Sequence, residues 1–275
     1  MQKFSVLMSV YKNEKVEYLK EAIESVFSQT ILPNEIVIVK DGPLTIELDK
    51  YLGILADNYK SVKFVTLKEN KGLGLALREG VQACSNELIA RMDTDDIARK
   101  DRFEKQLLFF KSNPQVSLLG TCIEEFSKDY RKPDTKTLLP LIHDEIIKFA
   151  KKRNPFRHMT VMFKKSAVLE AGNYRDFLWF EDYDLWVRMI DKGFKVANLP
   201  DILVSVRADG NMFARRGGWK YLKQDIKFQR FLLLIRFINV KSFVLNTFIR
   251  TCVRVIPNNV RIFFYKNMLR RGCND

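Results

Sequence analysis

Apolar and polar positions follow two different periods along the first hundred residues. Short apolar runs, typical of strands buried on both faces, alternate with segments that carry the apolar stripe of an amphipathic helix. The clearest stripe repeats every three or four residues and comprises Leu19, Ala22, Ile23, Val26 and Phe27. Strands are predicted at 4–11, 35–42, 62–67 and 87–92, and helices at 16–29, 47–59 and 72–84. This alternation predicts an α/β fold with a doubly wound, mostly parallel sheet.

Beyond residue 97 the alternation loosens, although both patterns continue. Helices are predicted at 99–113, 141–154 and 181–192, and strands at 116–126, 158–163 and 196–207. In the last of these helices, Leu185, Trp186 and Met189 are expected to face inward.

From residue 219 onward, apolar stretches are combined with an excess of positive charge. Between Trp219 and Arg271 there are twelve Lys and Arg against a single acid, Asp225, and they supply most of the formal net charge of +14. The pattern predicts basic amphipathic helices, which suit an anionic membrane surface. The alternative is a helical subdomain that packs on the body and exposes a basic face to solvent. A balance this basic points to anionic partners: nucleic acid, anionic lipid or phosphorylated substrates.

Cysteine usage and hydropathy limit the setting of the protein. The four cysteines are scattered and form no CxxC pair, so we expect reduced thiols in a cytosolic protein. The apolar stretch at the N-terminus is too short for a signal peptide and is interpreted as the first strand. No uncharged apolar run of about 18 residues occurs, so we expect no ordinary transmembrane helix.

Polar and acidic residues follow three of the predicted strands, at 11–13, 40–42 and 93–96. In parallel α/β sheets the carboxyl ends of the strands share one edge, and ligands bind beyond it. The last group has the sequence Asp-Thr-Asp-Asp, and its carboxylates would repel one another. Oxygen ligands suit a hard cation such as Mn²⁺ or Mg²⁺, which would offset that repulsion. The alternative is a solvated turn, or a helix N-cap formed by Asp96.

Two rival classes fit the sequence less well. A dehydrogenase would need GxGxxG after the first strand, where this chain has VYKNEK, and a P-loop is absent. A basic nucleic-acid- or membrane-binding protein without catalysis is the non-enzymatic alternative. It leaves the acidic clusters at 93–96 and 181–182 unexplained, because carboxylates repel phosphate in the absence of a metal.

Five segments taken in order are informative as a set: FSVLMSVYKNE, EIVIVKDG, ENKGLGLALREG, LIARMDTDD and GNYRDFLWFEDYDLWVRM. Over roughly residues 1–210 they resemble the family 2 glycosyltransferases with the GT-A fold, whose bacterial members build O-antigen and exopolysaccharide repeats. The segment VRADGNMFARRGGWKYLKQD is similar to a subgroup that transfers sugars onto lipid-diphosphate-linked acceptors. Processive synthases of this fold carry QxxRW and several membrane spans. Neither is found here, so transfer of a single sugar is expected.

The resemblance implies three parts. Residues 1–98 would be the nucleotide-sugar-binding half and 99–210 the acceptor-binding half of one GT-A domain, with 211–275 as a basic amphipathic helical membrane-associating tail. The partners implied are a UDP-hexose donor, an undecaprenyl-diphosphate-linked sugar acceptor and the anionic inner face of the cell membrane, where the protein would be peripheral and cytoplasmic. No nucleic-acid partner is expected.

On the donor side, the resemblance implies that Ser9 and Tyr11 line the uracil pocket. Asp41 would accept a hydrogen bond from uracil N3–H, and it would act alone because Lys40 stands where the family usually has a second acid.

Further along, Lys71 and Arg78 would sit near the nucleotide, although Asn is commoner at position 78 in the family. By the same resemblance Arg91 would approach the nucleotide-sugar. Asp93 would face the ribose or donor sugar, and Asp95, together with Asp93, would hold Mn²⁺ or Mg²⁺ on the diphosphate.

On the acceptor side, inverting transfer needs a base that takes the proton of the attacking hydroxyl. The resemblance assigns this role to Asp182, with Glu181 supporting the acceptor. The alternative is a pair of acids that merely favours the dipole at a helix N-terminus. Residues expected to contact the acceptor sugar or a diphosphate are Arg157, His158, Trp179, Arg207, Arg215 and Arg216. His143 is expected to be structural, and a structural His158 and a charged linker around Arg215 are the alternatives for those residues.

Overall fold

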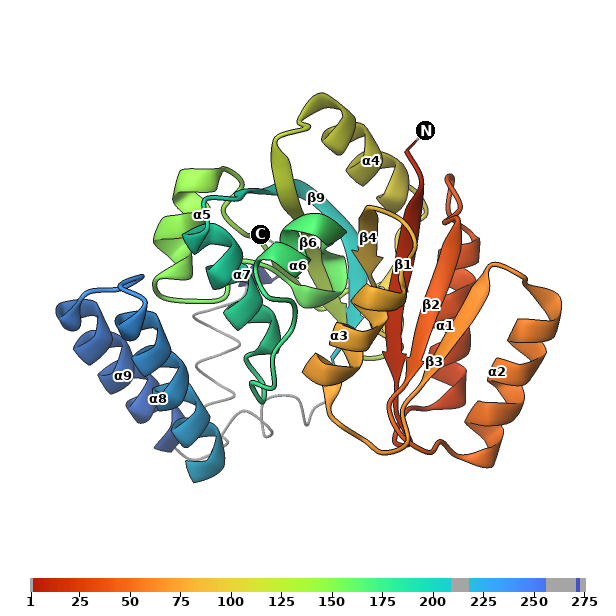
Figure 1. Ribbon diagram of the computed structural model, residues 1–275, viewed down its shortest axis with the longest axis horizontal. Coiled ribbons are helices and arrows are strands. Elements are labelled where there is room, and N and C mark those ends of the chain that lie inside the picture. Colours follow the sequence, from red (N-terminus) through yellow and green to blue (C-terminus); the bar gives the residue numbers. More distant parts are fainter. Residues whose placement is uncertain (1, 209–217, 256–270, 273–275) are drawn as a thin grey trace.

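The computed structural model describes residues 2–208, 218–255 and 271–272 (Figure 1). The first part of the chain forms four parallel strands in the order β3-β2-β1-β4. They are β1 (Phe4–Val10), β2 (Glu35–Lys40), β3 (Val62–Thr66) and β4 (Leu88–Arg91). The helices between them are α1 (Val16–Phe27), α2 (Ile46–Asn58) and α3 (Leu73–Ala83). The predicted alternation is confirmed, and the predicted ends differ from the observed ones by two residues or fewer.

The second part of the chain continues the same sheet with antiparallel pairings. Strand β8 (Met162–Lys164) runs antiparallel to both of its neighbours, β4 and β6 (Val116–Phe126). Strand β9 (Lys195–Arg207) lies parallel to β6 along most of its length. Three short strands complete the sheet: β5 (Ile97–Ala98), β7 (Thr135–Thr137) and β10 (Arg271–Gly272). The looser pattern after residue 97 therefore reflects a change from parallel to mixed pairing.

The predicted strand at 158–163 is wrong in its first half. Residues His158–Thr160 form a 3-10 turn, η1, and the strand begins only at Met162. The N–H and the hydroxyl of Thr160 both donate to the carbonyl of Arg157, each at 2.9 Å, and these local bonds replace the ladder of a strand. His158 is thereby kept out of the sheet.

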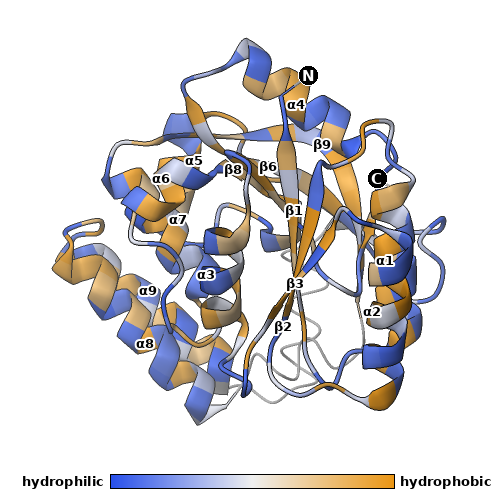
Figure 2. Ribbon diagram, turned by 45° about the vertical axis from the view of Figure 1, so that its right-hand side comes forward, coloured by the Kyte–Doolittle hydropathy of each residue, from blue (hydrophilic) through white to orange (hydrophobic). Residues whose placement is uncertain are grey.

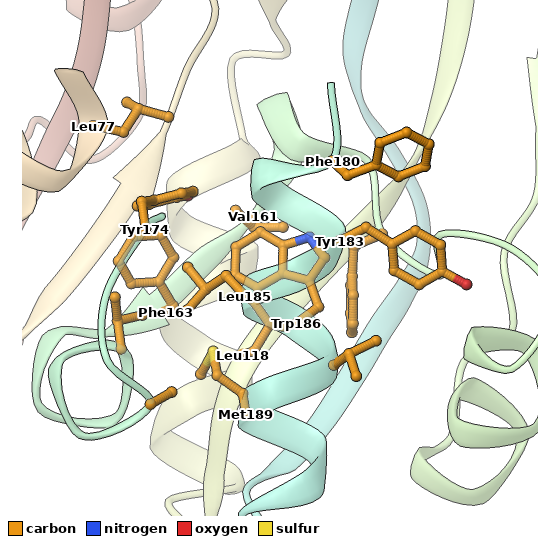
Figure 3. Close-up of a cluster of buried hydrophobic side chains, with 14 of the residues drawn as sticks. Leu77, Leu118, Val161, Phe163, Tyr174, Phe180, Tyr183, Leu185, Trp186 and Met189 are labelled. Atoms are coloured by element: carbon orange, nitrogen blue, oxygen red, sulfur yellow. The ribbon is translucent and has the colours of Figure 1, made fainter. Parts of the chain in front are cut away.

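Helices cover both faces of the sheet because side chains alternate along each strand. Val6 and Met8 pack with α1, α2 and α4 (Arg102–Ser112), whereas Leu7 packs with α3 and with the other helices of the second part. Those other helices are α5 (His143–Ala150), α6 (Lys165–Glu170) and α7 (Glu181–Asp191). Trp186 lies at the centre of the cluster that contains Leu7 (Figure 3). The ring centroids of Trp186 and Tyr174 are 6.3 Å apart.

The inward orientation expected for Leu185, Trp186 and Met189 is confirmed, since all three are fully buried. His143 has the structural place expected of it, because its Nδ1 accepts the backbone N–H of Val196 at 3.3 Å.

The predicted basic helices are α8 (Trp219–Leu234) and α9 (Val240–Val255), which lie side by side as a hairpin (Figure 1). Asp225 of α8 is buried and forms ion pairs with Arg250 and Arg254 of α9. Within the described residues no helix is long and apolar enough to cross a membrane. A further apolar stretch of the tail, RIFFYKNML at 261–269, lies outside the described residues.

Replacing Asp225 with Ala is expected to loosen the hairpin, because Arg250 and Arg254 would both lose a buried carboxylate partner. Removing one member of a buried ion pair typically costs about 3–5 kcal/mol. Amide hydrogen exchange should accelerate in α8 and α9 while α1 stays protected. Asp57→Ala, on the exposed face of α2, is the control, and unchanged exchange in the Asp225 variant would contradict the assignment.

Candidate active site

A cleft of about 1600 Å³ opens at the carboxyl edge of the parallel strands. Residues that follow β1, β2 and β4 all line it, so the predicted gathering of polar strand ends is confirmed. Its wall includes most of the residues assigned from the sequence, namely Ser9, Tyr11, Asp41, Lys71, Asp93, Asp95, Arg157, His158, Trp179, Glu181, Asp182 and Arg207. The cleft also reaches residues of α8 and α9, which the sequence did not place near the site.

The carboxylate of Asp41 holds the loop that leads into α3 by two hydrogen bonds. Its Oδ1 accepts the backbone N–H of Lys71 at 2.7 Å, and its Oδ2 accepts that of Gly72 at 3.1 Å. Gly72 has φ +85°, a conformation that favours glycine. A carboxylate has about four acceptor positions, so Asp41 keeps acceptor capacity toward the cleft that it lines.

Gly74 brings the start of α3 against the start of α7. A Cβ at this position would lie 2.6 Å from the carbonyl oxygen of Arg175 and 2.9 Å from Cβ of Glu181. Only glycine allows this approach, which joins the nucleotide-side loop to the acidic pair on α7.

Asp93, Asp95 and Asp96 form the acidic cluster at the end of β4. One carboxylate oxygen from each lies within 4.8 Å of the others. Burial, together with the charges of Asp93 and Glu14, raises the pKa of Asp95 to about 7. Burial and the charge of Asp95 raise the pKa of Asp96 well above its ordinary value. The positive charges near the cluster therefore do not balance its three carboxylates.

A divalent cation fits this cluster. Oδ1 of Asp96 accepts the backbone N–H of Arg207 at 2.9 Å, while its buried Oδ2 has no hydrogen-bond partner among the described residues. Hard oxygen donors of this kind suit Mn²⁺ or Mg²⁺. Asp96 thus joins Asp93 and Asp95 as a candidate ligand, a residue to which the sequence analysis gave no metal role.

Two arginines expected near the nucleotide do not line the cleft. Arg91 is 2% exposed and forms an ion pair with Asp93 from inside the protein. The guanidinium of Arg102, which is also buried, donates to the carbonyl of Arg91 at 2.7 Å. Arg78 lies on the exposed side of α3. In this structure Arg91 therefore acts on the site through Asp93.

Glu181 and Asp182 begin α7, on the cleft wall. Oδ2 of Asp182 accepts from Nδ2 of Asn154 at 2.6 Å, and Oδ1 accepts the backbone N–H of Tyr183 at 2.6 Å. Burial raises the pKa of Asp182, and these two bonds and the charge of Arg91 oppose the rise. Burial and the charge of Asp182 raise the pKa of Glu181 to about 7.

Asn154 is a site residue that the sequence analysis missed. The backbone N–H of Phe156 donates to its Oδ1 at 3.2 Å, which turns the amide N–H₂ toward Asp182. The two partners are 28 residues apart, and nothing local in the sequence marks an asparagine after a helix as part of a site.

The residues expected to contact the acceptor take different places. His158 shares a 2.9 Å hydrogen bond with the hydroxyl of Tyr174, and burial and the charge of Arg91 lower its pKa well below the ordinary value. Trp179 stacks on Tyr221 with ring centroids 4.8 Å apart and remains 38% exposed. Arg157 also lines the cleft.

Arg207 lies at the acidic cluster. Its Nε donates to the carbonyl of Asp95 at 3.2 Å, its guanidinium covers the ring of Tyr18 at 3.9 Å, and it pairs with Glu21. Arg215 and Arg216 lie outside the described residues.

The model of the family described as "Glycosyl transferase family 2" matches residues 5–172 of this chain. The chain belongs to this family. The resemblance and the glycosyltransferase activity predicted from the sequence are thereby confirmed, and the non-catalytic alternative is not supported.

Two curated relatives match almost the whole chain. The amylovoran biosynthesis glycosyltransferase AmsE of Erwinia amylovora is 41% identical over 263 residues, which cover 96% of this chain and 98% of the relative. An Escherichia coli protein named UDP-Gal:α-D-GlcNAc-diphosphoundecaprenol β-1,3-galactosyltransferase is 35% identical over 271 residues, covering 98% and 97%.

Solved structures bear out the GT-A fold class. S. aureus TarS 1–349 in complex with UDP-GlcNAc has a TM-score of 0.63 at 16% identity, covering 84% of this chain and 67% of that one. The mannosyltransferase PcManGT of Pyrobaculum calidifontis, in complex with GDP-Man and Mn²⁺, has a TM-score of 0.64 at 14% identity, covering 94% and 72%.

Gly74→Ala is expected to lower the rate of sugar transfer, because the added Cβ pushes the start of α7 out of place. Misplacing a catalytic group by about 1 Å can cost about a hundredfold. Initial rates and the melting temperature should be measured together. Gly53→Ala, in α2 with no atom within 4 Å of the added Cβ, is the control. A Gly74 variant as active as the control would show that this close approach is unnecessary.

Proposed function

We propose that the protein transfers one hexose from a UDP-sugar, with inversion, to a sugar carried on a lipid diphosphate, as in the assembly of O-antigen or exopolysaccharide repeat units. The proposal depends on one observation: the same cleft contains the aspartate cluster at the end of β4 and the carboxylate of Asp182, and the surroundings of the two differ. The cluster at the end of β4 has three carboxylates and an ion pair with one arginine, Arg91, whereas Asp182 accepts from two N–H donors. The name of the Escherichia coli relative, which states a UDP-sugar donor and a diphosphoundecaprenol-linked acceptor, supports the choice of donor and acceptor.

In this proposal residues 1–98 bind the donor and 99–210 bind the acceptor. Ser9, Tyr11 and Asp41 receive the uracil, and Lys71 lies beside the nucleotide. Asp95, with Asp93 and Asp96, would hold Mn²⁺ or Mg²⁺ against the diphosphate. Such a cation, when bound, offsets the negative charge that grows on the departing UDP.

Asp182 is the proposed base. Its bonds to Asn154 and Tyr183 aim the carboxylate and favour its charged form, so that it can take the proton of the acceptor hydroxyl as that oxygen attacks. Glu181 is placed beside it to bond another hydroxyl of the acceptor. The exposed face of Trp179 offers a platform for a sugar ring.

The proposed location is the inner face of the cell membrane. Large apolar side chains are exposed on the α8–α9 hairpin. They include Trp219, Leu234, Val240, Val244 and Phe248. Hydrophobic and hydrophilic residues are interspersed along both of its helices (Figure 2). An apolar face rimmed by Lys and Arg matches the boundary of an anionic bilayer, where it would bind peripherally.

Asp182→Asn is expected to abolish transfer while leaving UDP binding intact, because the amide cannot accept the hydroxyl proton at neutral pH. Sugar transfer is measured as the release of UDP, and UDP binding is measured by calorimetry. Asp191→Asn, at the exposed end of α7, serves as the control. Ordinary turnover by the Asp182 variant would end its assignment as the base.

Asn154→Ala is expected to shift the acid limb of the kcat–pH profile to higher pH. The N–H bond from Asn154 favours the ionised form of Asp182, so its loss raises the pKa of the base, and more of the enzyme is inactive at low pH. Rates at saturating donor should therefore recover as pH rises. A uniform fall in kcat with an unmoved limb would contradict this role.

A further inference from the structure

The cleft does not end at Asp182 but continues to the junction of α5 and α9. Its far end is lined by Phe149, Lys152 and Arg153 from α5 and the turn after it. From α9 it is lined by Leu245, Ile249 and Val253, among others. We propose that this end binds the diphosphate and the first lipid units of the acceptor, an inference that rests on the function proposed above.

Helix α9 is fixed to the turn that follows α5. Nδ2 of Asn246 donates to the carbonyl of Lys151 at 2.8 Å, and a guanidinium nitrogen of Arg250 donates to the carbonyl of Lys152 at 2.8 Å. Both carbonyls belong to the turn that directly follows α5, so the two bonds join this turn to α9. The wall of the cleft is therefore held in place before any ligand arrives.

The chemistry along this wall follows the order of groups in a lipid-linked sugar. Asp182 stands where the hydroxyl reacts, and Asn154 is bonded to it. Lys152 comes two residues before Asn154, a stretch of chain of at most about 7 Å. Beyond the cations lie the apolar side chains of α9. One sugar unit between the base and the diphosphate matches this spacing.

Lys152 supplies positive charge that a ligand at this end can contact. Lys152 is exposed and takes part in no ion pair among the described residues. Arg153, also exposed, stacks over the ring of Phe149 at 5.7 Å. Arg250 and Arg254, in contrast, already pair with Asp225 and act mainly to hold α9. Lys152 is therefore the principal diphosphate contact.

Helix α9 offers separate surfaces to the cleft and to its surroundings. Leu245, Ile249 and Val253 recur every four residues and line the cleft. Val244 and Phe248 lie one position earlier, are 59% and 66% exposed, and do not line it. The first stripe suits the lipid chain of the acceptor, and the second suits the bilayer.

The test uses the whole protein in solution, without membranes, and a sugar diphosphate that bears a short alkyl chain. Lys152→Glu should raise the KM for this acceptor about tenfold to a hundredfold, because charged hydrogen bonds are lost and repulsion is added. The KM for the UDP-sugar should not change. Lys151→Glu, an exposed neighbour outside the cleft, should behave like the wild type.

A second pair of variants separates the two stripes. Ile249→Ser should raise the KM for the alkyl-bearing acceptor but not for the sugar diphosphate without a chain. Phe248→Ser should leave both unchanged and weaken sedimentation with anionic vesicles.

Equal acceptor KM values for Lys152→Glu and Lys151→Glu would overturn the proposal. So would a Lys152→Glu defect that appears only on anionic vesicles, since the lysine would then contact lipid headgroups. If the wild type transfers no sugar to such acceptors, the proposed function fails. In that case, calorimetry that compares acceptor binding by the wild type and by Lys152→Glu still tests the proposed diphosphate site. Equal affinities, or no binding by either protein, would refute that site.

Discussion

Repulsion among three carboxylates at the carboxyl edge of the sheet is the constraint on which the site depends. Asp93, Asp95 and Asp96 come shortly after β4, where Asp96 is buried and the other two are half-buried, so that little water surrounds their charges. The protein offsets part of this from inside, where Arg91 pairs with Asp93, and part from β9, where the backbone of Arg207 binds Asp96. Asp95 is left at the cleft with a raised pKa, so the site is arranged to receive positive charge.

The carboxylate of Asp182, which lines the same cleft, has hydrogen-bond donors that favour its negative charge. Asp182 is half-buried, but an amide and a backbone N–H are directed at its two oxygens. Two carboxylates whose surroundings differ in this manner can take different roles in one reaction. Gly74 links the two sides, because the start of α3 can touch Glu181 only where a side chain is missing. In the mechanism that we propose, charge neutralisation at the donor and proton transfer at the acceptor are therefore carried out by different carboxylates.

The sequence predicted those features that depend on neighbouring residues. Period and run length located the parallel strands and their helices, and the acids after residue 92 marked the functional edge. Features that depend on distant contacts were not predicted. The bond between Asn154 and Asp182 spans 28 residues, and the buried position of Arg91 follows from its pairing with Asp93 inside the fold. The turn at His158 arises from bonds of Thr160 that override the strand pattern. The extension of the cleft to α9 depends on how the hairpin docks, which no local pattern encodes.

Calorimetry of UDP binding with and without Mn²⁺ tests the central claim most directly. The account predicts that Mn²⁺ strengthens UDP binding to the wild type and has little effect on Asp95→Asn, because Asp95 would hold the cation that favours binding of the diphosphate. Equal affinity of the wild type for UDP in Mn²⁺ and in EDTA would contradict it.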